Sequence, residues 1–340
     1  MNDMNTTNQR IVLASRPVGA PGADNFRFEE VPLAPLEDGQ LRVQHHFMSL
    51  DPYMRGRMND TKSYAQPQPL NETMIGGTVG EVIESRNEKY AIGDKVVGFG
   101  GWQLYSTASG KGDVNKVDTT HIPLSAYLGS VGMPGMTAWY GLMKICEPKP
   151  GETVCVDAAS GAVGSVVGQL AKLMGCHVIG IAGGPDKCAY VANELGFDAC
   201  IDYKAFPEPA DFYPALKAVT PNGIDCHFEN VGGTIMDAVL LRMNAFGRIA
   251  LCGMISGYNG VPIPMAAPQL ILQSRLKIQG FIVSEHMQHW PDGLGELGGL
   301  VATGKLKFRE SVAQGLASAP QAFFDLLKGK NFGKQLVKLL

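Results

Sequence analysis

Long apolar runs are missing from this sequence, although 45% of its 340 residues are hydrophobic. A membrane-spanning helix needs about 20 consecutive, mostly apolar residues, so we expect no membrane span. The stretch from Met1 to Arg10 is polar and lacks the apolar centre of a secretory signal. Both absences favour a cytoplasmic protein.

An excess of positive charge is missing as well, because 32 acidic residues outnumber 29 basic ones and the net charge is −3. Proteins that bind nucleic acid usually concentrate lysine and arginine on one face, so we expect no nucleic-acid partner. At this length the chain can form two domains, each with its own core.

The seven cysteines include no pair at the Cys-x-x-Cys spacing of many zinc sites. An odd number of cysteines, scattered through apparent strands and helices, predicts free and mostly buried thiols. The one histidine pair, His45 and His46, would point to opposite faces of a strand and could not easily ligate one ion. We therefore expect no metal site.

A strand, a tight turn and a helix are predicted in the middle of the chain. Small and β-branched residues alternate over 153–158, the turn over 159–164 reads Ala-Ser-Gly-Ala-Val-Gly, and apolar residues then recur at helical spacing. Gly161 would let a pyrophosphate approach the backbone, and Gly164 would let the helix pack close to its strand. A second strand over 177–182 completes a βαβ unit, so the pattern predicts a dinucleotide site.

The second strand ends without the acidic residue that binds the ribose 2′-OH of NAD. Gly183 and Gly184 stand there instead, and Lys187 follows three residues later. These features favour NADP over NAD, although Asp186 lies nearby and argues the other way. The alternative for Lys187 is an ordinary solvated lysine at a helix start.

The N-terminal part of the chain predicts a small β domain. Residues 11–50 alternate with period two between prolines, and further short strands are expected at 75–83 and 93–99. A compact, turn-rich segment at 49–58 carries Tyr53. Many short strands with glycine turns between them suggest a barrel-like domain.

Strands and helices alternate from residue 128 onwards. Beyond the βαβ unit, parallel strands are expected at 199–203, 223–230, 248–253 and 276–283. Six parallel strands with intervening helices predict an α/β doubly wound sheet.

Three pieces near the C-terminus are too few to form a domain, so we expect them to return to the β domain. They are strand-like at 306–310, helix-like at 319–329 and strand-like at 335–339. The predicted organisation is therefore a β domain made of residues 1–127 and 301–340, with a nucleotide domain of residues 128–300 inserted into it.

Seven segments, spread in order over nearly the whole chain, carry a family resemblance. They are residues 50–58, 132–138, 159–164, 229–233, 252–259, 280–283 and 329–334. The chain resembles zinc-independent members of the medium-chain dehydrogenase/reductase superfamily. Within it, the chain is similar to the branch with leukotriene B4 dehydrogenase/prostaglandin reductase and plant double-bond reductases, and most of all to the bacterial curcumin reductases.

The resemblance implies a GroES-like catalytic domain built from both termini, an inserted Rossmann domain, NADPH as the cofactor and a homodimer. It places Gly161–Gly164 at the pyrophosphate, Lys187 and Tyr203 at the adenosine end, and Asn230 on the ribose side. The implied cofactor-binding residues are Met133, Thr137, Ser160, Gly161, Ala162, Val163, Gly164, Gly183, Lys187, Tyr203, Asn230, Cys252, Gly253, Ser256, Tyr258, Phe281, Ile282, Val283 and Asn331. Read alone, several of these could be core or turn residues.

The resemblance also implies reduction of the carbon–carbon double bond of α,β-unsaturated ketones or aldehydes, so the expected partner is a small-molecule substrate. Hydride would reach the β-carbon, and a tyrosine would stabilise the charge that develops on the carbonyl oxygen. The candidates are Tyr258, which ranks first, then Tyr53 and Tyr64. Two alternatives remain open: an NADPH quinone oxidoreductase, and a protein that binds NADPH without catalysis.

Overall fold

The computed structural model describes residues 7–206 and 208–340, which form two compact units. The first unit consists of Glu310–Asn331, Gln335–Leu340 and the described residues within Met1–Leu128. The second consists of Gly129–Arg309 and Phe332–Lys334. Each unit has its own sheet and its own core.

The division differs from the sequence prediction after residue 300, since residues 301–309 and 332–334 belong to the second unit. A pair of hydrogen bonds explains the first difference. The Gln169 side chain donates to the Lys307 carbonyl and accepts from the Lys307 N–H, both at 2.8 Å. The segment after residue 300 is thereby tied to a helix of the second unit.

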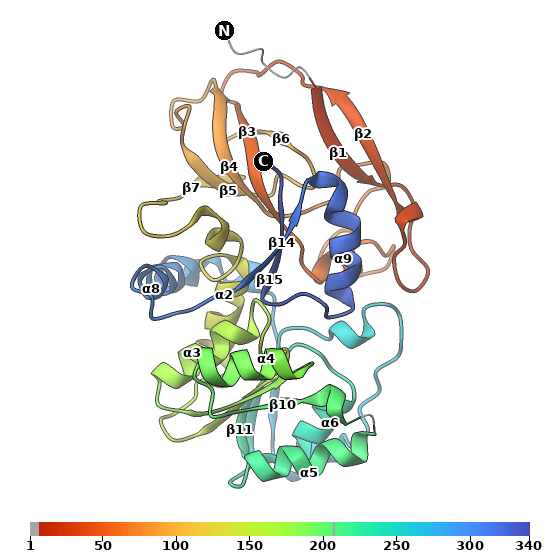
Figure 1. Ribbon diagram of the computed structural model, residues 1–340, viewed down its shortest axis with the longest axis vertical. Coiled ribbons are helices and arrows are strands. Elements are labelled where there is room, and N and C mark those ends of the chain that lie inside the picture. Colours follow the sequence, from red (N-terminus) through yellow and green to blue (C-terminus); the bar gives the residue numbers. More distant parts are fainter. Residues whose placement is uncertain (1–6, 207) are drawn as a thin grey trace. The chain divides into compact units, whose positions relative to one another are not determined.

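The second unit contains a six-stranded, all-parallel sheet (Figure 1). Its strands are β8 (Thr153–Val156), β9 (His177–Ala182), β10 (Ala199–Asp202), β11 (Ile224–Glu229), β12 (Met243–Leu251) and β13 (Lys277–Gly280). Their order is β10-β9-β8-β11-β12-β13, so the predicted doubly wound sheet is confirmed. Strand β12 begins five residues earlier than expected, and β13 ends before residues 281–283.

Helices cover both faces of this sheet (Figure 1). They include α3 (Gly164–Leu173), α4 (Pro185–Ala189), α5 (Pro209–Val219) and α6 (Thr234–Leu240), with α2 (Met133–Tyr140), α7 (Gln269–Gln273) and α8 (Trp290–Ala302) elsewhere in the unit. Ile181 and Ile201 share an apolar core with Phe212 of α5. Because strand side chains alternate, the neighbouring Gly180 faces the opposite helical layer, where Val191 lies.

The first unit is β-rich, as the sequence predicts. Its strands are β1 (Thr7–Leu13), β2 (Phe26–Pro32), β3 (Leu41–Ser49), β4 (Thr78–Ser85), β5 (Lys95–Gly98), β6 (Tyr105–Ala108), β7 (Val114–Lys116), β14 (Glu310–Gln314) and β15 (Lys334–Lys338). Strands β1 and β2 pair with each other, and the others form a sheet in the order β14-β15-β3-β4-β5-β7, with β6 also paired to β3. Trp102 is fully buried in this unit. Its ring stacks on the Phe26 ring, with the ring centroids 5.3 Å apart, and meets the Phe323 ring edge-on, with the centroids 5.7 Å apart.

Two local expectations in the first unit need correction. The strand expected at 306–310 begins only at Glu310, because the backbone of Lys307 pairs with the Gln169 side chain instead of with a strand. The turn-rich segment at 49–58 contains a short helix, α1 (Tyr53–Arg57). The predicted helix near the C-terminus is confirmed as α9 (Ala319–Leu327).

All seven cysteines are free thiols and four of them are buried, as expected from their number and scatter. Over the described residues, the helices are too short or too polar to cross a bilayer. The cytoplasmic location stays a prediction.

Candidate functional site

The predicted strand, turn and helix come together at the carboxyl end of β8. The turn is closed by the Gly161 N–H, which donates to the Ala158 carbonyl at 2.8 Å, and Ala158 itself has a φ of +44°. A Cβ on Gly164 would lie 2.5 Å from the same carbonyl oxygen, so only glycine fits at the start of α3. The first N–H groups of a helix have no acceptor within it and attract anions. This turn has the form of a phosphate cradle.

Basic and phenolic side chains gather over Gly183, just beyond the end of β9. A Cβ on Gly183 would lie 2.9 Å from Lys204 Cε and 3.0 Å from Tyr203 Oη. Lys187 is half-buried nearby, and its pKa is lowered by burial and by the charge of Lys204. Asp202 is turned toward the backbone, where it accepts the Gly184 and Lys204 N–H groups. Two ammonium groups held this close suit an anion.

Lys204 was not singled out in the sequence. It follows Tyr203 at the end of β10, the neighbour of β9 in the sheet. The carboxyl ends of neighbouring parallel strands meet at one edge, so the position of Lys204 two residues after β10 is the signal that could have found it.

Met133 and Thr137 share one face of α2. Both are half-buried, whereas the residues between them are buried. Thr137 Oγ1 donates to the Met133 carbonyl at 2.8 Å. Their spacing of four places both side chains at the less covered side of the helix.

The loops after β11, β12 and β13 carry the next group of expected residues. The N–H groups of Cys252 and Gly253 both donate to the Glu229 carbonyl, at 2.9 and 3.1 Å. Ser256 Oγ donates to the Val231 carbonyl at 2.6 Å, which links the two loops.

The remaining expected residues of the second unit lie after β13 and in the phosphate turn. After β13, the centroid of the Phe281 ring lies 5.6 Å from the centroid of the Tyr140 ring. Ile282 is half-buried and Val283 buried, and Ser160 is buried in the phosphate turn. All but one of the expected cofactor residues therefore belong to the second unit, and most of them follow the carboxyl ends of its strands.

The three candidate tyrosines differ in their surroundings. The Tyr258 hydroxyl accepts the Met254 N–H at 3.4 Å and lies close to Gly253 in the second unit. In the first unit, the Tyr53 hydroxyl is shielded from solvent, and among the described residues it has no hydrogen-bond partner. Burial and the charge of Asp51 raise the Tyr53 pKa. Tyr64 is 55% exposed, and Asn331, the remaining expected cofactor residue, also belongs to the first unit.

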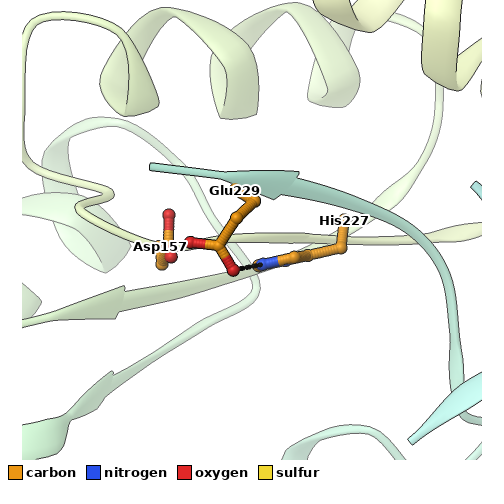
Figure 2. Close-up of side chains that lie close together, drawn as sticks. All are labelled: Asp157, His227 and Glu229. Carbon is orange, nitrogen blue, oxygen red and sulfur yellow. Dashed lines mark hydrogen bonds and ion pairs between the residues drawn. The ribbon is translucent and has the colours of Figure 1, made fainter. Parts of the chain in front are cut away.

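Three fully buried side chains, Asp157, His227 and Glu229, meet at the ends of β8 and β11 (Figure 2). His227 Nε2 lies 3.1 Å from Glu229 Oε2, and Glu229 forms a hydrogen bond with Asp157. Burial and the charge of Glu229 raise the pKa of Asp157 well above its usual range. Burial opposes ionisation of Glu229, but hydrogen bonds from His227 and Asp157 outweigh it and lower its pKa to about 2. Two adjacent carboxylates without solvent repel each other when both are ionised, so a proton shared between them stabilises the pair, a feature that the sequence analysis missed.

This cluster is the one group of side chains in the described part of the chain whose spacing would allow a metal ion, with donor atoms within 4.8 Å of one another. Structural zinc usually has four protein ligands, and catalytic zinc has three plus an open position for water, whereas only three side chains converge here and all are fully buried. Asp157 Oδ1 and Glu229 Oε1 already accept backbone N–H groups at 2.7 and 2.6 Å. The cluster fits a proton-sharing network and does not fit zinc.

Comparison with known proteins gives matches over both units. Residues 9–117 match a family model described as the N-terminal domain of oxidoreductase, and residues 162–297 match one described as zinc-binding dehydrogenase. The chain is 44% identical to the NADPH-dependent curcumin reductase of Escherichia coli, over 100% of this chain and 99% of the relative. It is 39% identical to the NADP-dependent 2-alkenal reductase of Nicotiana tabacum, over 97% of each chain.

A solved structure agrees with these relatives. The crystal structure of CurA from Vibrio vulnificus in complex with NADPH has a TM-score of 0.91 and 45% identity, over 98% of this chain and 99% of that one. Identity at this level over the full length of both units shows common descent. The chain belongs to the medium-chain dehydrogenase/reductase family.

Proposed function

We propose that this protein reduces the carbon–carbon double bond of α,β-unsaturated ketones and aldehydes with NADPH. When bound, NADPH supplies a hydride to the β-carbon of the substrate. The chain's own residues bind the cofactor, orient the substrate and stabilise the charge that develops on the carbonyl oxygen. The names of the relatives at 39–44% identity, curcumin reductase and 2-alkenal reductase, support this choice.

The geometry of the second unit supports NADPH as the cofactor. The turn at Gly161–Gly164 offers helix N–H groups to the pyrophosphate, and Lys187 and Lys204 offer positive charge to the 2′-phosphate. Tyr203 lies with Lys204 over Gly183, where its ring can cover the adenine. The homodimer also stays a prediction.

The observation that carries the enone assignment is the Tyr53 hydroxyl. A buried hydroxyl usually has a partner, so an unpartnered one costs stability unless a ligand completes it. Its raised pKa keeps the phenol protonated, so it can donate a hydrogen bond to a developing enolate oxygen without a metal. Tyr258 is the second candidate donor.

The test compares two electron acceptors in one assay. Purified protein should oxidise NADPH with an enone such as curcumin or a 2-alkenal, and mass spectrometry should show a product that has gained two hydrogens and kept its carbonyl. The saturated ketone serves as the control substrate. If the quinone is reduced and the enone is not, the protein is a quinone oxidoreductase. If neither acceptor is reduced, the protein binds NADPH without catalysis.

Activity should survive exhaustive chelation, although one matching family model is named for zinc binding. The reason is that the Asp157, His227 and Glu229 cluster is already satisfied by its own hydrogen bonds. Metal analysis of the purified protein should find no stoichiometric zinc. A one-to-one zinc content that disappears together with activity would refute the metal-independent assignment.

A further inference from the structure

Hydrogen bonds from two sides meet at Glu229 in the buried cluster. His227 Nδ1 lies 3.1 Å from the Cys155 carbonyl oxygen, which can only accept, so Nδ1 carries a hydrogen. One hydrogen lies between His227 Nε2 and Glu229 Oε2, and another between Glu229 and Asp157. Two ionised carboxylates in contact at zero exposure would repel each other strongly, so the shared proton is required.

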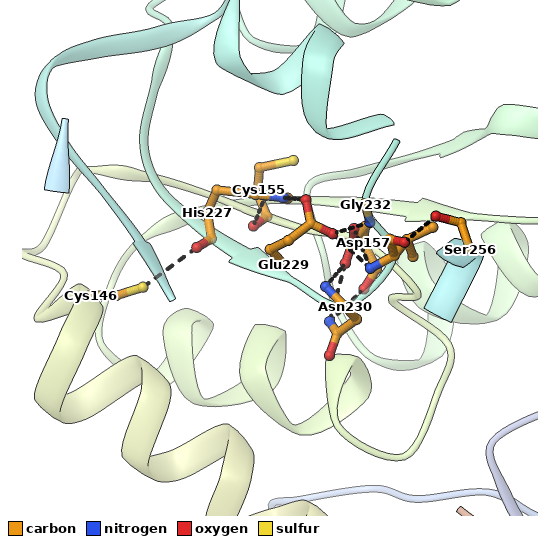
Figure 3. A network of polar contacts seen from close by, with 9 residues as sticks. Cys146, Cys155, Asp157, His227, Glu229, Asn230, Gly232 and Ser256 are labelled. Atoms are coloured by element: carbon orange, nitrogen blue, oxygen red, sulfur yellow. Dashed lines mark hydrogen bonds and ion pairs between the residues drawn. The ribbon is translucent and has the colours of Figure 1, made fainter. Parts of the chain in front are cut away.

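The remaining oxygen lone pairs of the two acids face three consecutive backbone amides (Figure 3). Asp157 Oδ1 accepts the Asn230 N–H at 2.7 Å, and Glu229 Oε1 accepts the Val231 and Gly232 N–H groups at 2.6 and 2.7 Å. The Asn230 side chain also donates to Asp157 Oδ1, at 3.2 Å. Hydrogen bonds to carboxylates are among the stronger ones in proteins. The loop after β11 is therefore held from inside the unit.

The loop after β11 in turn holds the loop after β12. The Asn230 carbonyl accepts the Ile255 N–H at 3.1 Å, and the Val231 carbonyl accepts both the N–H and the hydroxyl of Ser256, at 3.0 and 2.6 Å. The Tyr258 N–H then donates to the Ile255 carbonyl at 3.2 Å. A continuous series of hydrogen bonds thus leads from two buried acids to a residue of the proposed site.

We propose that Asp157 and Glu229 are positioning residues, which hold Asn230 and Tyr258 in the arrangement that reduction requires. The inference rests on the proposed function, because both held residues belong to its site. Both acids have zero exposure, so they act through the loops and not by contact with substrate. An uncharged side chain of the same shape should therefore replace either acid.

Substitutions at Asp157 distinguish the need for its hydrogen bonds from the need for its acidic group. In Asp157→Asn, the amide oxygen still accepts the Asn230 N–H and the amide nitrogen still donates to Glu229. Only the longer contact with the Val231 N–H, at 3.2 Å, is lost, and Val231 keeps its bond to Glu229, so kcat should stay within about twofold of wild type. Asp157→Ala removes all of these bonds, and kcat should fall about 10- to 100-fold, as expected for misplaced site residues. Glu229→Gln and Glu229→Ala repeat the comparison if Asp157→Ala does not fold.

Thr220→Ala is the matched control for loss of a buried polar group. Thr220 has zero exposure in the same unit, but its hydroxyl bonds to Leu216 and Arg242, away from both loops. This variant should lower Tm without lowering kcat. Amide hydrogen exchange supplies a readout independent of activity: Asp157→Ala should speed exchange at 230–232 and 254–258, and leave 177–182 unchanged.

Two outcomes would overturn the proposal. Equal losses of kcat in Asp157→Asn and Asp157→Ala would mean that the acidic proton itself is needed. Unchanged exchange at 230–232 in Asp157→Ala, or in Glu229→Ala, would mean that the acids do not hold the loop. If the wild-type protein shows no enone reduction, the proposed function fails, and the exchange experiment still decides whether the acids hold the loops.

Discussion

Replacing Lys187 with alanine should raise the KM for NADPH about 10- to 100-fold and leave the KM for NADH nearly unchanged. A charge-assisted hydrogen bond to a phosphate contributes about 1.5–3 kcal/mol, and NADH lacks the 2′-phosphate that would receive it. Lys187 is half-buried beside Lys204 and next to Gly183, where the acidic residue of an NAD site is missing. Steady-state kinetics with both cofactors measures the difference.

Lys172→Ala is the control, because this lysine lies in the same unit but pairs with Asp198 at 2.8 Å. It should change neither KM value. An equal rise for NADPH and NADH in Lys187→Ala would show that Lys187 does not contact the 2′-phosphate.

The pH dependence of the KM for NADPH supplies a second readout of the same lysine. Burial and the charge of Lys204 lower the pKa of Lys187, so its ammonium loses its proton at lower pH than an ordinary lysine does. The KM for NADPH should therefore rise as pH increases through this lowered pKa, while the KM for NADH should not follow it. Lys204→Ala removes the repulsion and should move that rise to higher pH.

Tyr53→Phe should lower kcat on an enone about 10- to 100-fold and yet leave the folded protein as stable as wild type, or more stable by about 1 kcal/mol. The expected loss of kcat is that of one hydrogen-bond donor to a developing oxyanion. The expected gain in stability follows because the hydroxyl is buried and has no hydrogen-bond partner within residues 7–206 and 208–340, and phenylalanine removes that penalty. Kinetics and chemical denaturation measure the two effects.

The other two tyrosines provide the comparison. Tyr258→Phe removes a hydroxyl that accepts the Met254 N–H, so it should lose stability together with activity. Tyr64→Phe, at 55% exposure, should change little. The sequence ranks Tyr258 first, but the buried Tyr53 hydroxyl has no hydrogen-bond partner among the described residues, so we rank Tyr53 ahead of Tyr258. If Tyr53→Phe keeps full kcat while Tyr258→Phe loses it, the original order is right. If all three variants keep full kcat, none of the candidate tyrosines stabilises the oxygen.

The sheet of the second unit could be predicted because its information is local. Apolar runs of strand length, glycine turns and helical periodicity recur along the sequence, and the order of the strands follows from the rules of doubly wound folds. The strand predicted at 306–310 was wrong because a distant side chain, Gln169, captures the backbone of Lys307. Nothing in the local pattern could reveal that competitor.

The features of the site that the sequence analysis missed also depend on distant pairs. Asp157 and Glu229 are 72 positions apart, and each looks like an ordinary strand-end acid until β8 and β11 pair. Lys204 lies over Gly183 only because β10 pairs with β9. The glycine turn, by contrast, is contained within a few residues, so its shape was predictable.

The place of β15 in its sheet has a consequence for how the chain is made. This strand, Lys334–Lys338, lies between β14 and β3, so the sheet of the first unit joins strands made before the second unit to strands made after it (Figure 1). The six parallel strands of the second unit all lie within Gly129–Arg309 and emerge from the ribosome before β14 does. Domains commonly fold as units during translation. The nucleotide-binding unit can therefore assemble on the nascent chain, while the sheet of the first unit is incomplete until β14 and β15 have been made.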